Sequence, residues 1–367
     1  MYKYCLIKSR EYIKKYLPFS AILFPLPAPS LIVFFVTSQC NALCEHCFLP
    51  LSSRGQNQDI SKENILKIIK SLNRRVKIVL TGGEPFLRKD LKSIVNELMD
   101  SALTQSIDIL SNGSLPEEIE SVCKEICLKH KKPLRLQLSL DGLAKTHDTI
   151  RKIPDGFNKV IDACERMKKI KQQFPQFSFI VSATIMKQNI SEIEDLVNYL
   201  EKQGYSSKLA IVRGNSFSTF GVPQGILNPE YNPRAKAAVE AKEIEQLIEK
   251  ISKKHPKYFT FFEKIKLKII LNTLIFKRRQ LFCYAGYNDA VVYSNGDIGM
   301  CEQVKPFGNL SDWNWDLRKA WNSKEAIKHR AQLTSCACIH GCNIGSSICS
   351  GGPYLGQSRH IIKSTQC

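Results

Sequence analysis

Residues 31–47 read LIVFFVTSQCNALCEHC, and the interpretation of the whole chain starts from this stretch. It opens with an apolar run, Leu31–Thr37, whose length is typical of a buried strand. Three cysteines follow directly: Cys40, Cys44 and Cys47. In α/β barrels the loops that follow the strands carry the functional groups. The stretch therefore predicts an α/β fold with thiol chemistry at the carboxyl end of its first strand.

The alternation of apolar strand and amphipathic helix continues along residues 31–215. Further strands are expected at 76–80, 106–110, 134–140, 177–184 and 208–212. Helical patterns separate them at 61–72, 90–100, 116–128, 156–174 and 191–203. Six units in a row favour parallel strands with right-handed crossovers. We expect a partial (β/α)6 TIM-like barrel, and a doubly wound sheet is the alternative that periodicity leaves open.

The composition divides the chain into four expected parts. They are an N-terminal extension (1–30), the barrel (31–225), a basic helical connector (226–282) and a small cysteine-rich α+β domain (283–367). The net charge is +19, and residues 250–282 hold ten Lys or Arg against one acid, Glu263. This basic segment favours weak peripheral membrane contact at most, and no nucleic-acid module accompanies it. No apolar run is long enough to span a membrane and no export signal is present, so we expect a cytoplasmic protein.

Fourteen cysteines in a chain without an export signal indicate metal or redox chemistry rather than disulfides. Three thiolates on one loop can bind three irons of a four-iron cluster and leave the fourth iron open. This Cys-x3-Cys-x2-Cys loop, followed by the aromatic Phe48, resembles that of the radical S-adenosylmethionine (radical SAM) enzymes. The resemblance implies a [4Fe-4S] cluster at Cys40, Cys44 and Cys47 whose open iron binds S-adenosylmethionine. It also implies reductive cleavage of that cofactor to a 5′-deoxyadenosyl radical, which abstracts a substrate hydrogen.

Further motifs follow the next strands and support the resemblance. Glycines let a backbone approach a ligand closely, and the resemblance implies that the first of these motifs binds the methionine ammonium. It also implies contacts with the cofactor's ribose and carboxylate from the others. Each short motif can also be an ordinary turn, and Thr184 and Asn189 match the family only loosely. The residues concerned are Gly82, Gly83, Glu84, Pro85, Ser111, Asn112, Ser139, Asp141 and Arg151.

A second cysteine group begins at Cys283. The segment up to Cys301 is expected to form a hairpin with an Asn-Gly turn. Its Cys-x12-Gly-x4-Cys spacing resembles the start of the SPASM and twitch extensions of radical SAM enzymes. The resemblance implies one or two auxiliary [4Fe-4S] clusters, and the later cysteine gaps of one, three and six residues leave that count open. A zinc ribbon and disulfides are the alternatives. The expected ligands are Cys283, Cys301, Cys336, Cys338 and Cys342.

The resemblance favours an enzyme that oxidatively modifies or matures a peptide. Dehydrogenation or rearrangement of a small molecule, such as a sugar or alcohol, is the alternative within the family. A non-catalytic iron–sulfur electron carrier is the alternative of another class. The enzyme would need a reductant such as flavodoxin or ferredoxin. Because only about thirty residues precede the first strand, no built-in leader-binding domain is expected, and a separate peptide-binding partner could act in trans. The sequence assigns no protein acid or base.

Overall fold

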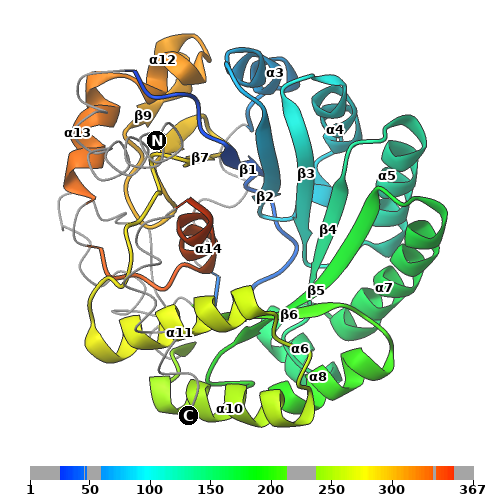
Figure 1. Ribbon diagram of the computed structural model, residues 1–367. Helices are drawn as coiled ribbons and strands as arrows, with labels where there is room; N and C mark the ends of the chain where they lie inside the picture. Colours follow the sequence, from blue (N-terminus) through cyan, green and yellow to red (C-terminus); the bar gives the residue numbers. More distant parts are fainter. Residues whose placement is uncertain (1–24, 45, 48–58, 213–236, 334–335, 351–367) are drawn as a thin grey trace, which may run out of the picture.

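The computed structural model describes residues 25–44, 46–47, 59–212, 237–333 and 336–350 (Figure 1). One nine-stranded sheet has the order β6-β5-β4-β3-β2-β1-β7-β8-β9. Neighbours from β6 to β7 are parallel, and β8 and β9 continue the sheet in antiparallel fashion. The strands are β1 (Leu31–Thr37), β2 (Val76–Gly82), β3 (Thr104–Ser111), β4 (Leu134–Ser139), β5 (Phe177–Ile185), β6 (Ser207–Ile211), β7 (Asp289–Val292), β8 (Asp297–Gly299) and β9 (Gly308–Asn309).

Strands β1 to β6 lie side by side in chain order, as the partial barrel requires. A doubly wound sheet has a point where the strand order reverses, and β1 to β6 contain no such point, so that alternative is wrong. Figure 1 shows these strands as an arc with α3, α4, α5 and α7 along its outer side. The helices of this part are α3 (Lys62–Lys70), α4 (Leu91–Asp100), α5 (Pro116–Lys129), α6 (Ala144–Arg151), α7 (Gly156–Gln173) and α8 (Ile193–Lys202).

Alternation along each strand separates the two faces of the sheet. In β2, Ile78 and Leu80 are completely buried in the core between sheet and helices. Lys77 and Val79 therefore point to the opposite, inner face. Local residues define where helices begin. The Ser61 side chain caps α3 by accepting a hydrogen bond from Asn64 N, and Pro116 is the first residue of α5.

The predicted connector contains two helices, α10 (Ala241–Lys254) and α11 (Phe261–Phe276). Four further helices differ from what the sequence indicates. The sequence pattern of residues 316–333 predicts one helix, but the structure has two, α12 (Leu317–Trp321) and α13 (Lys324–Gln332), because the Ser323 side chain caps a new helix by accepting from Ala326 N. Helices α6 and α14 (Gly341–Ser350) were not predicted. Each is short, and its few apolar residues give too little periodicity to detect.

The expected hairpin is present as β7 and β8, and Gly296 in its turn has φ +95°. Its pairing with the barrel was not predicted. Strand β7 runs parallel to β1 in the register Leu31↔Asp289 to Phe34↔Val292. The sheet thus crosses the domain boundary expected at residue 282, and the division into four parts stays a prediction. In the described part of the chain, no helix is both long enough and apolar enough to cross a membrane.

Candidate functional site at the strand ends

The three cysteines after β1 belong to one packed cluster. Ala42, Cys44 and Ile153 are buried together, and Cys40 and Cys47 pack against them. The loop is compact because Cys47 N donates to the Cys44 carbonyl at 3.2 Å, and Ala42 N donates to the Cys40 Sγ at 3.4 Å. The fold therefore brings together the three thiols that the sequence singled out. Phe48 lies outside the described residues.

Within the described residues, no three His, Cys, Asp or Glu side chains are placed to bind a single metal ion. A four-iron cluster has a different requirement, because each cysteine binds its own iron. Three thiols spread around one loop, with apolar residues beneath them, fit that requirement. The loop therefore fits a cubane cluster better than it fits a lone zinc ion.

The two glycines of the loop after β2 approach the cysteine loop. Gly83 N donates to the Thr37 carbonyl at 2.9 Å and Glu84 N donates to the Gln39 carbonyl at 2.7 Å. A Cβ on Gly82 would lie 2.3 Å from the Thr37 oxygen, and one on Gly83 would lie 1.9 Å from the Gln39 oxygen. Gly82 also has φ +133°, which other residues rarely adopt. Glycine is thus required at these two positions because their backbone lies against Thr37 and Gln39 at the start of the cysteine loop. The sequence analysis instead predicts a close approach of this backbone to a ligand.

Glu84 joins the loops after β2 and β3. Its side chain is 1% exposed. Its carboxylate accepts hydrogen bonds from Ser111 Oγ at 2.9 Å, Asn112 N at 2.7 Å and Phe86 N at 3.2 Å. Burial raises the pKa of Glu84 to about 7, although these hydrogen bonds favour the ionised form. Pro85 is buried at the start of the 3-10 turn η2 (Pro85–Leu87). A buried carboxylate with a raised pKa gains from a nearby cation, which fits an ammonium group at this edge.

Asn112 extends the same network to the cysteine loop. Its Nδ2 donates to the Asn41 Oδ1 at 2.9 Å, and the Asn41 Nδ2 donates to the Ser114 Oγ at 2.8 Å. Asn41 lies directly after Cys40, so the loops after β1, β2 and β3 form one connected unit. The sequence singled out Ser111 and Asn112 but not Asn41 or Ser114, because no spacing rule connects residues more than seventy positions apart.

Asp141 and Arg151 form a buried ion pair on the other side of the cysteine loop. Arg151 Nε donates to the Asp141 Oδ2 at 2.7 Å, and Nη2 lies 2.6 Å from the same oxygen. Burial opposes ionisation of Asp141, but Arg151 and His46 outweigh it and hold its pKa below the ordinary value. Arg151 also lies 3.8 Å from the Cys44 sulfur, and its carbonyl accepts from Leu43 N at 3.1 Å. The guanidinium thus places a positive charge beside a predicted cluster ligand.

Thr184 and Asn189, which matched the family only loosely, are part of this arrangement. Thr184 N donates to the Asp141 Oδ1 at 2.8 Å, and Asn189 Nδ2 donates to the Asp141 carbonyl at 2.6 Å. His147 Nδ1 accepts from Asp141 N at 3.1 Å. Both oxygens of the Asp141 carboxylate are therefore already used within the protein. Ser139, the last residue of β4, alternates with the core leucines and lies on the inner face.

The second cysteine group also converges. Cys301 is buried and lies within electrostatic range of both Cys283 and Cys338, and Cys336 lies within range of Cys283. Burial raises the pKa of Cys283 to about 11 and that of Cys301 well above its ordinary value. No disulfide joins two cysteines of the described residues. Thiols gathered in this way suit an iron–sulfur cluster, in which each thiolate binds its own iron.

Cys342 is exposed at the start of α14 and lies within electrostatic range of Lys208 of β6. Cys283, Cys301, Cys336 and Cys338, four of the predicted auxiliary ligands, lie within electrostatic range of one or more of the others. Cys123, Cys127 and Cys164 are buried in α5 and α7, as expected of packing residues.

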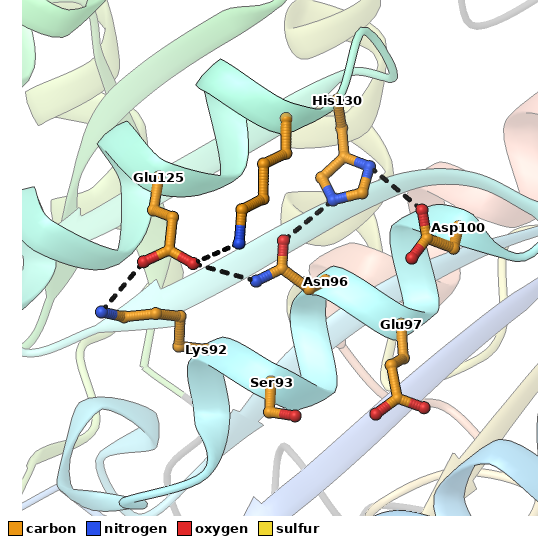
Figure 2. A pocket seen from close by; sticks show the side chains of 8 residues that line it. Lys92, Ser93, Asn96, Glu97, Asp100, Glu125 and His130 are labelled. Atoms are coloured by element: carbon orange, nitrogen blue, oxygen red, sulfur yellow. Dashed lines mark hydrogen bonds and ion pairs between the residues drawn. The ribbon is translucent and has the colours of Figure 1, made fainter.

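A surface hollow between α4 and α5 is not part of these sites (Figure 2). Glu125 there forms ion pairs with Lys92 at 3.1 Å and Lys129 at 2.8 Å. His130 interacts with Asn96 at 2.9 Å, and its Nδ1 lies 3.6 Å from Asp100. Figure 2 shows these side chains turned toward one another. Since its charges are paired internally, this hollow offers no candidate chemistry.

Comparison with known proteins agrees with both cysteine groups. The Radical SAM superfamily model matches residues 34–200, and the SPASM model, described as an iron-sulfur cluster-binding domain, matches residues 283–343. The AdoMet-dependent heme synthase of Methanosarcina barkeri is 30% identical over 172 residues, which are 45% of each chain. Sporulation killing factor maturation protein SkfB of Bacillus subtilis is 28% identical over 173 residues, 46% of this chain and 39% of SkfB. The matched segment thus spans less than half the length of these two relatives.

Two solved structures share the fold over most of the chain. SuiB of Streptococcus suis, bound to precursor peptide SuiA, has a TM-score of 0.59 at 18% identity, covering 88% of this chain and 70% of SuiB. anSMEcpe with bound AdoMet has a TM-score of 0.56 at 16% identity, covering 83% of this chain and 80% of the other. The two family models and this shared fold agree with the cysteine loops and their neighbours. The chain therefore carries a Radical SAM domain and a SPASM iron–sulfur cluster-binding domain.

Proposed function

We propose that this chain reductively cleaves S-adenosylmethionine and uses the resulting radical to modify a peptide oxidatively. One observation carries the proposal. The loops after β1, β2 and β3 form a single hydrogen-bonded unit that holds three thiols and the Glu84 carboxylate at one sheet edge, and the Arg151 guanidinium of α6 lies beside the Cys44 sulfur. Radical SAM domains bind a [4Fe-4S] cluster and S-adenosylmethionine, and SPASM domains bind auxiliary clusters. We also propose the oxidoreductase class and the roles of the individual residues.

The chain's own residues bind and orient the cofactors. Cys40, Cys44 and Cys47 are the ligands of the catalytic cluster, and Phe48 follows them in the sequence. When bound, the cluster and S-adenosylmethionine supply an electron and a 5′-deoxyadenosyl radical that abstracts hydrogen from the substrate. The backbone of the Gly82–Pro85 turn lies beside Thr37 and Gln39 and is proposed to bind the methionine ammonium. Ionised Glu84, beneath that turn, favours a cation there.

Two charged residues orient the loop rather than the substrate. Arg151 neutralises Asp141 and faces the Cys44 sulfur, so a thiolate there gains from its charge. Asp141 in turn anchors the Thr184 backbone. Ser111, Asn112 and Ser139 are proposed to contact the cofactor's polar groups from the ends of β3 and β4.

The C-terminal cysteines are proposed to bind one or two auxiliary clusters. Cys283, Cys301, Cys336 and Cys338 are gathered and suit one cluster. Cys342, at the start of α14, is proposed as a further ligand of this group. Such a cluster would accept the electron that remains after hydrogen abstraction, or would bind substrate at an open iron.

The peptide is preferred as substrate because SkfB is named a maturation protein and SuiB, which shares the fold, holds a precursor peptide. A small molecule is the second candidate substrate, since two other relatives, at 30% and 33% identity, are named AdoMet-dependent heme synthase and GTP 3′,8-cyclase. A reductant such as flavodoxin or ferredoxin, a separate peptide-binding partner and a cytoplasmic location complete the proposal.

The test is formation of 5′-deoxyadenosine and methionine by the anaerobically purified protein with dithionite and S-adenosylmethionine. The triple variant Cys40→Ala/Cys44→Ala/Cys47→Ala should form none, whereas Cys123→Ala, which removes a core thiol, should form it normally. A fully iron-loaded wild type that forms no deoxyadenosine would make the chain an electron carrier. Candidate peptides and sugars are then compared by how far each one accelerates deoxyadenosine formation.

The same triple variant tests the auxiliary clusters. It should retain about four irons for one auxiliary cluster or about eight for two, with sulfide-to-iron absorption. A colourless triple variant that binds zinc would show that the C-terminal cysteines form a structural metal site.

A further inference from the structure

The inner face of the parallel sheet carries charged side chains away from the cofactor edge. In β2, β3, β4 and β6 the apolar residues that alternate with them are buried in the core between sheet and helices. Side chains alternate between the faces of a strand. The charged ones therefore face the interior of the partial barrel. They are Lys77, Asp108, Arg135 and Lys208.

These side chains are close enough to interact. Lys77 Nζ lies 2.9 Å from the Asp108 Oδ2, and Arg135 forms an ion pair with the same oxygen through Nη2. Lys208 lies within electrostatic range of Asp108 and Arg135, and also of Lys266, which α11 contributes. We call these five residues the inner cationic site. It contains four cations and one carboxylate.

Within the described residues, the inner cationic site has one carboxylate for four cations. Asp108 is buried and is shared by two of the cations through one oxygen. The Arg135 Nε is buried and has no hydrogen-bond partner in the part of the chain that the structure describes. A buried N–H of a charged group without a partner is costly, and guanidinium groups bind planar anions through paired N–H bonds. One further anion would provide the missing acceptor and reduce the repulsion among the cations.

The position of the inner cationic site suits a substrate. Arg135 lies four residues before Ser139 on β4, and Asp108 lies three residues before Ser111 on β3. At about 3.3 Å per residue, roughly 10–13 Å separate the site from the cofactor edge. Lys208 also interacts with Cys342, at the start of α14. The site therefore lies on the inner face below the cofactor edge, with Cys342 of the C-terminal module within electrostatic range of Lys208.

We propose that the inner cationic site binds a carboxylate of the substrate, so that the reacting carbon of the substrate lies nearer the cofactor edge. This inference rests on the proposed function, because the anion is taken to belong to the substrate. In a peptide the carboxylate would come from an acidic side chain or from the C-terminus. The basic charge of α11 then has a role in substrate binding, at Lys266, beyond a solvated helix face.

The experiment is a lysine footprint of the anaerobic holoenzyme with an amine-acylating reagent, read by mass spectrometry. N-acetylglutamate should slow acylation of Lys77 and Lys208 several-fold and leave Lys92, on the outer surface, unchanged. N-acetylglutamine α-amide, which has a similar shape but no carboxylate, should have no effect. Equal protection by both compounds, or protection by inorganic phosphate but not by N-acetylglutamate, would overturn the proposal. An α-amidated acidic peptide and a peptide with only a C-terminal carboxylate then distinguish the two carboxylate sources.

Variants test the residues directly. Arg135→Gln and Lys208→Gln should each abolish the protection of Lys77 by N-acetylglutamate, and Lys92→Gln should preserve it. Circular dichroism checks that each variant is folded. Because the two substitutions lie on different strands, the test remains possible if one of the variants does not fold. Full protection in both folded site variants would refute the assignment.

The footprint requires neither S-adenosylmethionine nor a reductant, so its result is independent of the proposed function. If the protein forms deoxyadenosine but N-acetylglutamate gives no protection, only the proposal of the inner cationic site is refuted. If N-acetylglutamate gives protection but the protein forms no deoxyadenosine, the inner cationic site is an anion site and the proposed radical chemistry is refuted.

Discussion

Replacing Arg151 by Met should destabilise the fold strongly. The change removes the two contacts that Arg151 makes with the Asp141 carboxylate, at 2.6 and 2.7 Å, and leaves that carboxylate completely buried. Thr184 N would remain as one donor at 2.8 Å. Removing one partner of a buried pair costs about 3–5 kcal/mol because the remaining charge is uncompensated.

A partly exposed arginine provides the matched control. Arg166 contacts Glu117, Glu120 and Asp162, three carboxylates, yet its side chain is 28% exposed. Exposed ion pairs contribute up to about 1 kcal/mol, so Arg166→Met should have a small effect although it breaks more contacts. The comparison separates burial from the number of ion pairs.

Anaerobic thermal unfolding, followed by circular dichroism, measures both variants. Arg151→Met should lower Tm by on the order of 10 °C, and Arg166→Met by a few degrees. The double variant Asp141→Asn/Arg151→Met also removes the unpaired charge of the buried Asp141 carboxylate, so its Tm should be higher than that of Arg151→Met alone. If Arg151→Met lowers Tm no more than Arg166→Met does, the buried pair is not the anchor of the cysteine loop.

The other predictions concern the two cysteine groups and Glu84. Because burial raises the pKa of Glu84 from 4.5 to about 7, its contribution to stability is complete below pH 4.5 and is lost as the pH rises to about 7. Glu84→Gln should remove that component, which unfolding midpoints at about pH 5 and 8 would reveal. Gly83→Ala should lower iron content because its Cβ would meet the Gln39 carbonyl, whereas Gly345→Ala, with its nearest contact at 3.7 Å, should not. Cys301→Ser should lose one cluster's iron, and Cys164→Ser should lose none; equal iron in both would contradict the auxiliary ligand set.

The local features of this chain were predictable from its sequence. The strands and main helices of the barrel follow from apolar repeats of two and 3.6 residues, which neighbouring residues establish without help from distant ones. The order of the strands followed because consecutive strand–helix units join parallel neighbours. The cysteine loops were recognisable because their ligands lie within a few residues of one another.

Features that depend on distant partners were decided only by the tertiary structure. Pairing of β7 with β1 joins segments more than 250 residues apart, and no local pattern specifies that register. The close approach of Gly83 to Gln39, and the turn of Glu84 toward Ser111, depend on how parallel strands align at their ends. From the sequence, Lys266 is only one of many basic residues in the helical connector. Its proximity to Lys208 arises from the packing of a helix near a sheet edge, which helical periodicity alone cannot determine.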